Sequence, residues 1–366
     1  MPITRRDFAL GALLSSLAGC ATDTFARAAQ DGDVMRLDID QPVIRLAFGS
    51  CVHQDKPQPF WEVIASRLPH AFVCLGDNVY PKKTDLAFDS DTEAIAFAFQ
   101  RQTARADFAA FRDKVPFLGI WDDNDYGESD AGSSYPHKSV SRQLFLDFVG
   151  EPPTSPRRTR AGGLYVAYEF GPPGQVCQLI LPDLRYSRTD WKRTDESTRQ
   201  QLGLSGFGPY LADLSADATL LGDEQWKWLE RVFARPASVR ILGSSIQALS
   251  AARGWEGWSN FPKEQRRLIE LVDQSSGQTL ILSGDAHFAE VSAIEAPSGK
   301  AIYDVTSSGL TESWPHPGPN ANRWNDAVFT GTNFGLIHVN LVDEKAVVVA
   351  ELHQADGYRL FQHVIQ

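Results

Sequence analysis

Short apolar segments that end in a glycine or a polar residue recur along this chain, and they constrain its fold more than any other feature. The segments at residues 43–49, 71–76 and 116–121 are rich in β-branched and aromatic residues, as buried strands are. Segments with helical spacing separate them, at residues 59–68 and 93–113. Successive strand and helix units of this kind predict an α/β fold in which the polar strand ends lie together at one edge of a sheet.

The rest of the chain continues this pattern and then changes to strands alone. A Pro- and Gly-rich stretch, residues 150–163, is expected to be a surface loop without regular structure. Further helices are expected at residues 139–149, 222–233 and 262–273, and further strands at residues 164–170, 175–188, 239–247 and 279–291. From residue 301 onward the sequence alternates as strands do. We see no internal repeat, and we expect one α/β domain with two packed sheets and helices outside.

The first 28 residues have the features of an export signal. Arg5 and Arg6 precede an apolar stretch, residues 8–19, that is too short to span a bilayer comfortably. The pair is similar to a twin-arginine signal, which is read by an export machinery that carries folded proteins. The segment ending at Cys20 is similar to a lipobox, which would anchor the protein to a membrane, whereas Ala26, Arg27 and Ala28 offer a plain cleavage site instead. We therefore expect a signal segment at residues 1–28, a linker at 29–42 and the folded domain at 43–366, in the periplasm or on the cell envelope.

Composition excludes several classes of protein. The chain has 366 residues, of which 43% are hydrophobic, so it can bury a large core and is not disordered. Its formal net charge is -11, and it has no sustained Lys/Arg run, so no nucleic-acid-binding surface is evident. Beyond Cys20 three cysteines remain, and this odd number makes a disulfide framework unlikely. Cys74 and Cys177 lie in apolar runs and are expected in the core, but Cys51 follows a strand end.

The strand ends carry side chains that could hold metal ions. "GDNVY" places Asp77 and Tyr80 three residues apart, and "GDAHF" places Asp285 two residues before His287. "WDDND", at residues 121–125, crowds acidic side chains that repel one another unless a cation lies between them. Hard oxygen ligands suit divalent cations, and histidine, thiolate or phenolate ligands suit iron or zinc. These strand ends therefore predict a site for two or more metal ions.

A longer series of motifs, which includes the three above, resembles the motifs of one family in their order along the chain. The series is "FGSC", "LGDNVY", "IWDDNDYG", "LPDLRYSR", "GDEQWKWLE", "SSIQ", "SNFPKE", "LSGDAHF" and "TSSGLT". The series is similar to the PhoD-like branch of the metallophosphatases, known as alkaline phosphatase D, and spans the chain from about residue 43 to its end. The resemblance implies a four-layer α/β/β/α fold, without the extra N-terminal β-domain of the larger members. It also implies hydrolysis of phosphate monoesters and diesters by a metal-bound hydroxide, at a site that holds Fe3+ and Ca2+ or other divalent metals.

The resemblance also implies a role for each matching residue of the iron site. Asp77 would bridge the metals and act directly in catalysis. Tyr80 would bind iron as a phenolate and Cys51 as a thiolate, and His287 would be a further ligand.

The matching residues of the second metal site are carboxylates and an amide. Asp123 and Asp285 would hold this metal. Asp122 and Asn78 would be ligands or would support the ligands. Tyr126 and Asp125 are expected to fix the turn that follows.

Arg185, in "LPDLRYSR", has two possible roles on the sequence evidence. It could neutralise the phosphate of the substrate, because a guanidinium binds phosphate with two parallel hydrogen bonds, or it could pair with Asp183. The tryptophans Trp61 and Trp121 are expected in the core.

One residue departs from the family pattern. PhoD-like chains usually carry a histidine where this chain has Asn124, at the position of the catalytic histidine of the wider superfamily. Asparagine can donate a hydrogen bond to a phosphoryl oxygen but cannot deliver a proton, so esters of weakly acidic alcohols should suffer most. His53 and His137 are expected to be solvated loop residues, and with His316 they are the candidates to replace the missing proton donor.

Three functions remain open at this point. The first is an exported metallophosphoesterase acting on a phosphate ester. The second is a phospholipase-type or phosphotriester-type activity at the same site, which anchoring through Cys20 would favour. The third is a metal-binding pseudoenzyme, which Asn124 makes conceivable although every other expected ligand is present.

Overall fold

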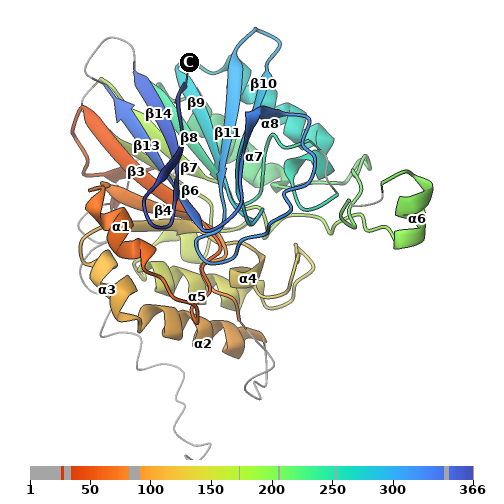
Figure 1. The fold of residues 1–366 in the computed structure, drawn as a ribbon, viewed down its shortest axis with the longest axis horizontal. Coiled ribbons are helices and arrows are strands. Elements are labelled where there is room, and N and C mark those ends of the chain that lie inside the picture. Colours follow the sequence, from red (N-terminus) through yellow and green to blue (C-terminus); the bar gives the residue numbers. More distant parts are fainter. Residues whose placement is uncertain are drawn as a thin grey trace, which may run out of the picture.

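The computed structural model of the chain (Figure 1) describes residues 26–28 by their backbone, and residues 34–81, 91–172, 174–204, 207–251, 254–341 and 346–365 in full. Within these residues the strands form two sheets, of nine and of six strands. The order of the larger sheet is β1-β2-β6-β7-β8-β9-β11-β10-β12, and that of the smaller is β15-β14-β13-β3-β4-β5. Helices lie outside both sheets, so the chain forms the mixed α/β domain with two sheets that its sequence predicts.

The smaller sheet carries the strands that lead into the acidic motifs. Its strands are β15 (Arg359–Ile365), β14 (Val347–Gln354), β13 (Asn333–Asn340), β3 (Val43–Gly49), β4 (Ala71–Leu75) and β5 (Phe117–Ile120). The last three are parallel, and their register places Gly49 beside Cys74 and Cys74 beside Gly119. Their carboxyl ends therefore lie level with one another at the same edge of the sheet.

The larger sheet supplies the remaining strand ends. Its strands are β1 (Ala26–Ala28), β2 (Met35–Leu37), β6 (Val166–Phe170), β7 (Cys177–Leu181), β8 (Val239–Ser244), β9 (Gln278–Ser283), β11 (Ala301–Ser307), β10 (Ala289–Glu295) and β12 (Arg323–Phe329). Strands β7, β8, β9 and β11 run parallel to one another.

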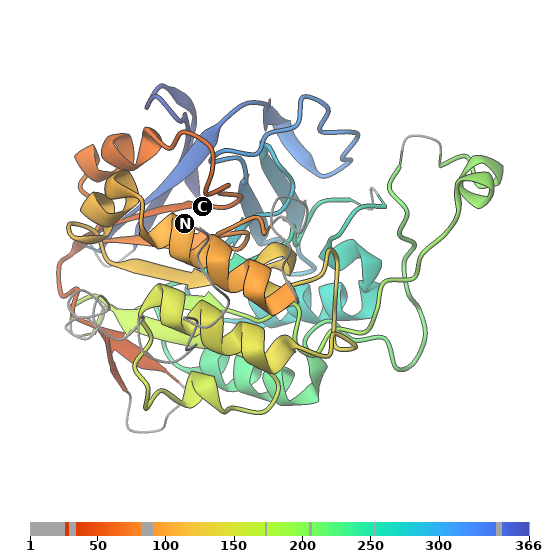
Figure 2. The ribbon, with the colours of Figure 1, turned by 90° about the horizontal axis from the view of Figure 1, so that it is seen from below.

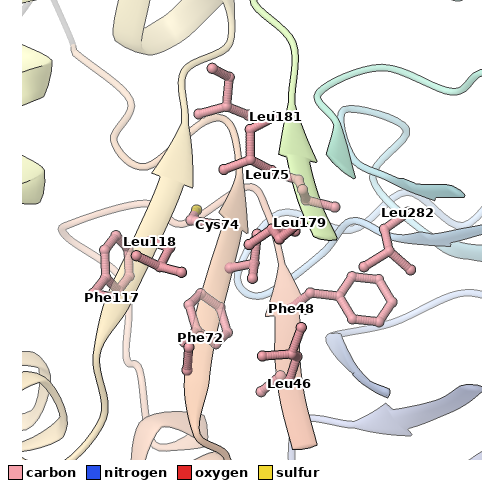
Figure 3. Packing of buried hydrophobic residues seen from close by; sticks show 14 of the residues in the cluster. Leu46, Phe48, Phe72, Cys74, Leu75, Phe117, Leu118, Leu179, Leu181 and Leu282 are labelled. Atoms are coloured by element: carbon pink, nitrogen blue, oxygen red, sulfur yellow. The ribbon is translucent and has the colours of Figure 1, made fainter. Parts of the chain in front are cut away.

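A hydrophobic core lies between the sheets (Figure 3). Leu46 and Phe72 of the smaller sheet belong to the same buried cluster as Leu179 and Leu282 of the larger one. Gly243 on β8 lets the sheets approach, because a Cβ there would lie 2.6 Å from Leu181 Cδ2 and 2.8 Å from Leu75 Cδ2. Cys74 and Cys177 are buried here, as predicted.

Helices cover the outer faces. On the side of the smaller sheet lie α1 (Phe60–Ser66), α2 (Asp91–Thr103), α3 (Ala106–Arg112) and α5 (Lys138–Val149), and Figure 2 shows α2 and α5 side by side across this face. Trp61 of α1 packs on Phe72, Phe111 and Phe117, with ring centroids 5.2, 4.7 and 6.5 Å away. Trp61 and Trp121 are buried, as predicted.

The helices of the opposite face are α7 (Gly222–Ala234) and α8 (Pro262–Gln274). They bury Trp226, Trp228 and Leu268 in a second cluster with Leu242 and Ile281 of the larger sheet. The short helix α6 (Glu196–Gln201) lies at the end of an arm that projects from the molecule (Figure 2). Among the described residues, no helix is long and apolar enough to cross a bilayer.

The structure differs from two local predictions. The single helix expected at residues 93–113 is two helices, because Arg105 adopts an extended backbone (φ -71°, ψ 129°) before α3. The expectation of a surface loop at residues 150–163 is wrong for Arg157, which is buried. Arg157 pairs with Glu151 at 2.8 Å, and its Nε donates to the carbonyl of Leu164, so this loop is tied to the core.

The N-terminal boundary also differs from the prediction. Residues 1–25, which include Cys20 and most of the predicted signal segment, and residues 29–33 lie outside the described residues. Ala26–Ala28 pairs with Met35–Leu37 as strand β1, and β2 continues the larger sheet beside β6. Val34, Leu37 and Ile39 are buried, so this part of the expected linker belongs to the folded domain.

Candidate metal centre

Strained backbone marks the strand ends that face one another. Eight described residues other than glycine have positive φ, and four of these are candidate ligands: Cys51 (66°), Asp77 (50°), Asp285 (62°) and His287 (60°). A left-handed backbone costs free energy in a residue with a Cβ atom, and it persists only where the surrounding structure enforces it. Such positions gather at functional sites, so this backbone supports the assignment of these four residues to a site.

Glycines allow the strand ends to converge. Gly76 has φ 102°, and a Cβ there would collide with the side chain of Asp122. Gly284 precedes Asp285, and a Cβ there would lie 2.7 Å from the carbonyl oxygen of Leu75 and 2.8 Å from Ser50 Oγ. These close contacts bring the ends of β4 and β5, and those of β4 and β9, against one another. Glycine therefore precedes Asp77 and Asp285 because a side chain at either position would collide with the neighbouring strand end.

One group of side chains combines sulfur, phenol, imidazole and carboxylate. The ligand atoms of Cys51, Asp77 and His287 lie within 4.8 Å of one another. The hydroxyl of Tyr80 donates to Asp77 Oδ2 at 2.8 Å and lies 3.2 Å from His287 Nε2. Cys51 Sγ also lies 3.1 Å from Ser308 Oγ. The structure thus brings together all four residues predicted for the iron site.

Carboxylates continue the site away from Cys51. Asp77 also belongs to a second group with Asp122 and Asp123, so it connects the thiol and imidazole end of the site to the carboxylate end. Two further groups each include Glu256, and they are Asp122, Glu256 and Asp285, and Asp123, Asp130 and Glu256. All the predicted carboxylate ligands are therefore part of one connected cluster.

Several buried polar atoms of this cluster lack a partner within the described residues. They include Asn78 Oδ1, Asp122 Oδ2 and His287 Nδ1. An unsatisfied buried polar atom typically costs about 1–3 kcal/mol, and native proteins keep few of them. The donor set of carboxylates, amide oxygen, imidazole, phenol and thiol fits hard cations, including iron. The residues present therefore fit a metal centre with more than one ion.

Burial dominates the electrostatics of the metal-free site. Burial and the nearby charges of Asp122 and Asp125 raise the pKa of Asp77 to about 8. Burial, together with Asp77, raises the pKa of the Cys51 thiol and of the Tyr80 phenol well above their ordinary values. Burial lowers the pKa of His287. These shifts favour the neutral form of each group, so a metal ion must displace protons from Asp77, Cys51 and Tyr80 to bind them, whereas a neutral imidazole at His287 binds without losing one.

Asn124 lies beside the candidate bridging residue. Its Nδ2 donates to Asp77 Oδ2 at 3.0 Å and to Asp123 Oδ1 at 3.1 Å, and its backbone N–H donates to Asp77 Oδ1 at 3.2 Å. It belongs to α4 (Asp123–Tyr126), a single helical turn. In this arrangement Asn124 orients two carboxylates.

Asn78 and Asp125 connect two strand ends. The backbone N–H and the side-chain Nδ2 of Asn78 each donate to Asp125 at 2.9 Å. The N–H of Asp122 donates to the same carboxylate at 3.1 Å. Asp125 therefore joins the end of β4 to the start of α4, and it leaves Asn78 Oδ1 available to another group.

The side chain of Arg185 pairs with two site carboxylates instead of Asp183. Its side chain is fully buried, and Nε donates to Asp122 Oδ1 at 2.7 Å. Its terminal nitrogens donate to both oxygens of Glu256, at 2.6 and 3.0 Å. Asp183 accepts only from the backbone N–H of Arg185, at 3.0 Å. The guanidinium is therefore paired with two site carboxylates and not with Asp183, which corrects the expected pairing. Its expected role toward a substrate phosphate stays a prediction.

Sequence reasoning missed Glu256 and Asp130 and gave no role to Ser308. Glu256 follows no strand, and only its position between Trp255 and Gly257 in a loop distinguishes it. Ser308 lies in "TSSGLT", one of the family motifs, but nothing in that motif indicates a contact with a ligand. The hydroxyl of Tyr210 donates to Asp130, a contact between residues 80 positions apart that no local pattern indicates.

The three candidate histidines lie in different surroundings. The prediction that His53 is solvated is wrong, because it is 6% exposed and its ring stacks on Tyr80 with centroids 5.6 Å apart. His137 and His316 are exposed.

Comparison with known proteins gives the family of this fold and site. The family model described as PhoD-like phosphatase matches residues 46–340. This chain belongs to the PhoD-like phosphatase family. No curated protein matches it. The site geometry and the family together make it a phosphatase with candidate metal-binding groups.

One solved structure supports the fold. It is described as the structure of PhoD, shares 15% sequence identity, covers 91% of this chain and 75% of its own, and has a TM-score of 0.59. The protein TT1561 of Thermus thermophilus shares 8% identity over 84% of this chain and 98% of its own, with a TM-score of 0.37. The first likeness confirms the predicted fold class.

Replacing Arg185 should destabilise the metal-free protein. Arg185→Met leaves Asp122 and Glu256 buried without a cation, so we expect the free energy of unfolding to fall by about 3–5 kcal/mol. Arg101→Met is the matched control, because Arg101 pairs with Asp55 at 2.7 Å on the surface, where a pair contributes about 0–1 kcal/mol. Urea unfolding of both variants measures the difference. Equal losses in the two variants would contradict this account of Arg185.

The stability of the metal-free protein should fall as the pH rises. The pKa of Asp77 changes from an ordinary 3.8 to about 8 in the folded chain, so between these values the folded state binds more protons than the unfolded state. The stability from this proton is fully present below pH 3.8 and is lost as the pH rises through about 8, at no more than about 1.4 kcal/mol per pH unit.

Urea midpoints at pH 6 and pH 9, with and without added metal, measure this effect. Metal should reduce the loss, and metal added at pH 7 should release protons. Asp77→Asn should flatten the dependence. A metal-free protein that is equally stable at both pH values would contradict the assignment.

Proposed function

We propose that this protein hydrolyses phosphate esters, both monoesters and diesters, at a centre that holds Fe3+ and Ca2+. The observation that carries this proposal is the convergence of Cys51, Asp77 and His287 within 4.8 Å, with the phenol of Tyr80 on Asp77 and His287. Thiolate, phenolate and imidazole ligands suit iron, and the adjoining carboxylates suit calcium. The PhoD-like family supports the reaction class.

The residues have distinct tasks in this proposal. Cys51, Tyr80 and His287 would hold iron, and Asp77, which also lies with Asp122 and Asp123, would be shared with the carboxylate end of the site. Bound cations supply a nucleophilic water near neutral pH and neutralise charge on the phosphoryl oxygens. Arg185 holds Asp122 and Glu256 in place through hydrogen bonds, and it lowers the pKa of Glu256 although burial opposes this. Because water is the nucleophile, no covalent enzyme intermediate is needed.

Asp77→Asn and Tyr80→Phe test the assignment. Asp77→Asn should lower kcat at least about 100-fold, because its amide is a poor bridge between two cations. Tyr80→Phe should remove a visible phenolate-to-iron absorption band. Activity on monoesters, diesters, triesters and phospholipids, with metal analysis, measures the first effect. Visible absorption spectroscopy measures the second. A fully metallated protein without turnover on any ester would instead favour a pseudoenzyme, and full activity of Asp77→Asn would contradict the proposed site.

Asn124 should make the rate depend strongly on the leaving alcohol. Without a proton donor at this position, esters of acidic alcohols such as nitrophenols should react well and alkyl esters poorly. Asn124→His should raise the rate on alkyl phosphates by up to about 10² to 10⁴-fold and change that on nitrophenyl phosphate little. The slope of log kcat against the pKa of the alcohol measures this. An unchanged slope would show that another group already supplies the proton. Asn124→Gln is the control, because it enlarges the side chain without adding a proton donor.

We also propose that the protein is exported by the twin-arginine machinery and anchored through Cys20. Arg5 and Arg6 support the first part. The pairing of β1 with β2 supports the second, because processing at Cys20 keeps Ala26–Ala28 in the mature chain whereas cleavage after Ala28 removes it.

Variants of the signal segment test this proposal. Replacing Arg5 and Arg6 together by lysine should leave the protein in the cytoplasm. Cys20→Ala should prevent lipid attachment, and Ala28→Leu should have no effect on it. Cell fractionation and the mass of the mature N-terminus measure the result. Processing after Ala28 would contradict the lipid anchor.

A further inference from the structure

Two exposed tryptophans lie beside the metal centre and against each other. The side chains of Trp255 and Trp314 are 48% and 47% exposed, and their ring centroids are 5.7 Å apart at an interplanar angle of 75°. The ring of Trp314 lies 5.1 Å from that of His287, a candidate metal ligand. Trp255 precedes Glu256, whose carboxylate belongs to the acidic cluster.

Their exposure is unusual for this chain. It has nine tryptophans, of which six are buried and Trp324 is partly buried. Single exposed apolar residues are common and need no explanation, but two large aromatic rings in contact at the border of a site indicate a binding surface. The surface has a defined position relative to the reacting group, because one of its rings packs on His287.

The loop that carries Trp314 is held by the backbone of two candidate ligands. Its N–H donates to the carbonyl of His287 at 2.7 Å. In the same loop the N–H of Thr311 donates to the carbonyl of Cys51 at 3.0 Å, and Glu312 pairs with Lys56 at 2.7 Å. This loop is therefore fixed to the metal centre.

Trp255 is held by its neighbours on both sides. Glu256 accepts two hydrogen bonds from Arg185, and the carbonyl of Gly254 accepts from the N–H of Tyr210 at 2.8 Å. Gly208 lies against the ring, since a Cβ there would be 2.6 Å from Trp255 Cδ2. Both rings are thus presented by fixed backbone, which limits the entropy lost when a ligand binds.

We propose that Trp255 and Trp314 bind a planar aromatic group of the substrate, so that the preferred esters are those of phenols or similar ring-bearing alcohols. The proposal rests on the proposed function, because it needs the phosphate to lie at the metal centre beside His287. An aromatic ring stacked on one indole meets the other indole edge to face, and both arrangements are favourable. Asn124 supports the same class independently, because phenols leave without a proton donor more readily than alkyl alcohols do.

Two esters with leaving alcohols of similar acidity separate ring binding from leaving-group acidity. Phenyl phosphate and hexafluoroisopropyl phosphate are suitable, and they are compared on the metal-loaded enzyme. Trp314→Ala and Trp255→Ala should each raise KM for phenyl phosphate by about three- to tenfold, with kcat changed less than about twofold, and leave KM for the fluorinated ester unchanged. Trp314→Phe and Trp255→Phe should restore most of the affinity. Tyr358→Ala is the control, since Tyr358 is 67% exposed in the hairpin between β14 and β15.

Binding without turnover keeps this inference distinct from the proposed function. Calorimetry should show phenylphosphonate binding the metal-loaded protein about tenfold more tightly than methylphosphonate, a preference lost in both alanine variants. This result in a protein without esterase activity would support the aromatic surface and contradict the proposed reaction. Three results would overturn the aromatic surface while leaving the phosphoesterase proposal intact. They are equal affinities for the two phosphonates, a parallel rise in KM for both esters, and a preference for phosphocholine over phenylphosphonate.

Discussion

The oxygen atoms of Asp77, Asp122 and Asp123 lie within 4.8 Å of one another, and all three side chains are buried. Charged carboxylates at this separation repel strongly in a medium of low polarity, and burial alone already disfavours their ionised forms. At one end of the cluster the positive charge of Arg185 offsets the negative charge of Asp122 and Glu256, with which it pairs. At the other end the pKa of Asp77 stays raised, so the cluster is complete only with cations that the chain does not provide. The strand ends are therefore arranged so that their side chains can surround cations.

The same requirement explains why the backbone is strained there. Ligand atoms can converge only if β3, β4, β5 and β9 bring their ends close together, and an ordinary extended backbone would point successive side chains to opposite faces. The left-handed conformations of Cys51, Asp77, Asp285 and His287 redirect these side chains. The buried core fixes the strand ends that precede these residues, so the short loops that carry them can keep the strain.

Much of this arrangement could be predicted because it depends on residues that are close together in the sequence. The apolar strands, the glycines before Asp77 and Asp285, and the polar residues after them are neighbours in the chain, and the parallel order of the strands places them together. The partners of Arg185 could not be predicted, because Asp122 and Glu256 are 63 and 71 residues away and the choice among acids depends on the packed structure. The burial of His53 and Arg157 in segments rich in polar residues, Pro or Gly has the same cause, since tertiary contacts outweigh local composition.

Asn124 shows how one substitution can preserve a site and change what it does. An amide at this position donates to both Asp77 and Asp123, so it holds two like-charged groups in place when cations separate them. An imidazole could supply a proton to a leaving alcohol, which an amide cannot. An amide here therefore keeps the geometry of the carboxylates but leaves the negative charge of the departing alcohol without a proton. Esters whose alcohol is a stable anion react without that proton, and the aromatic rings at Trp255 and Trp314 lie where such a group would extend from the metal centre.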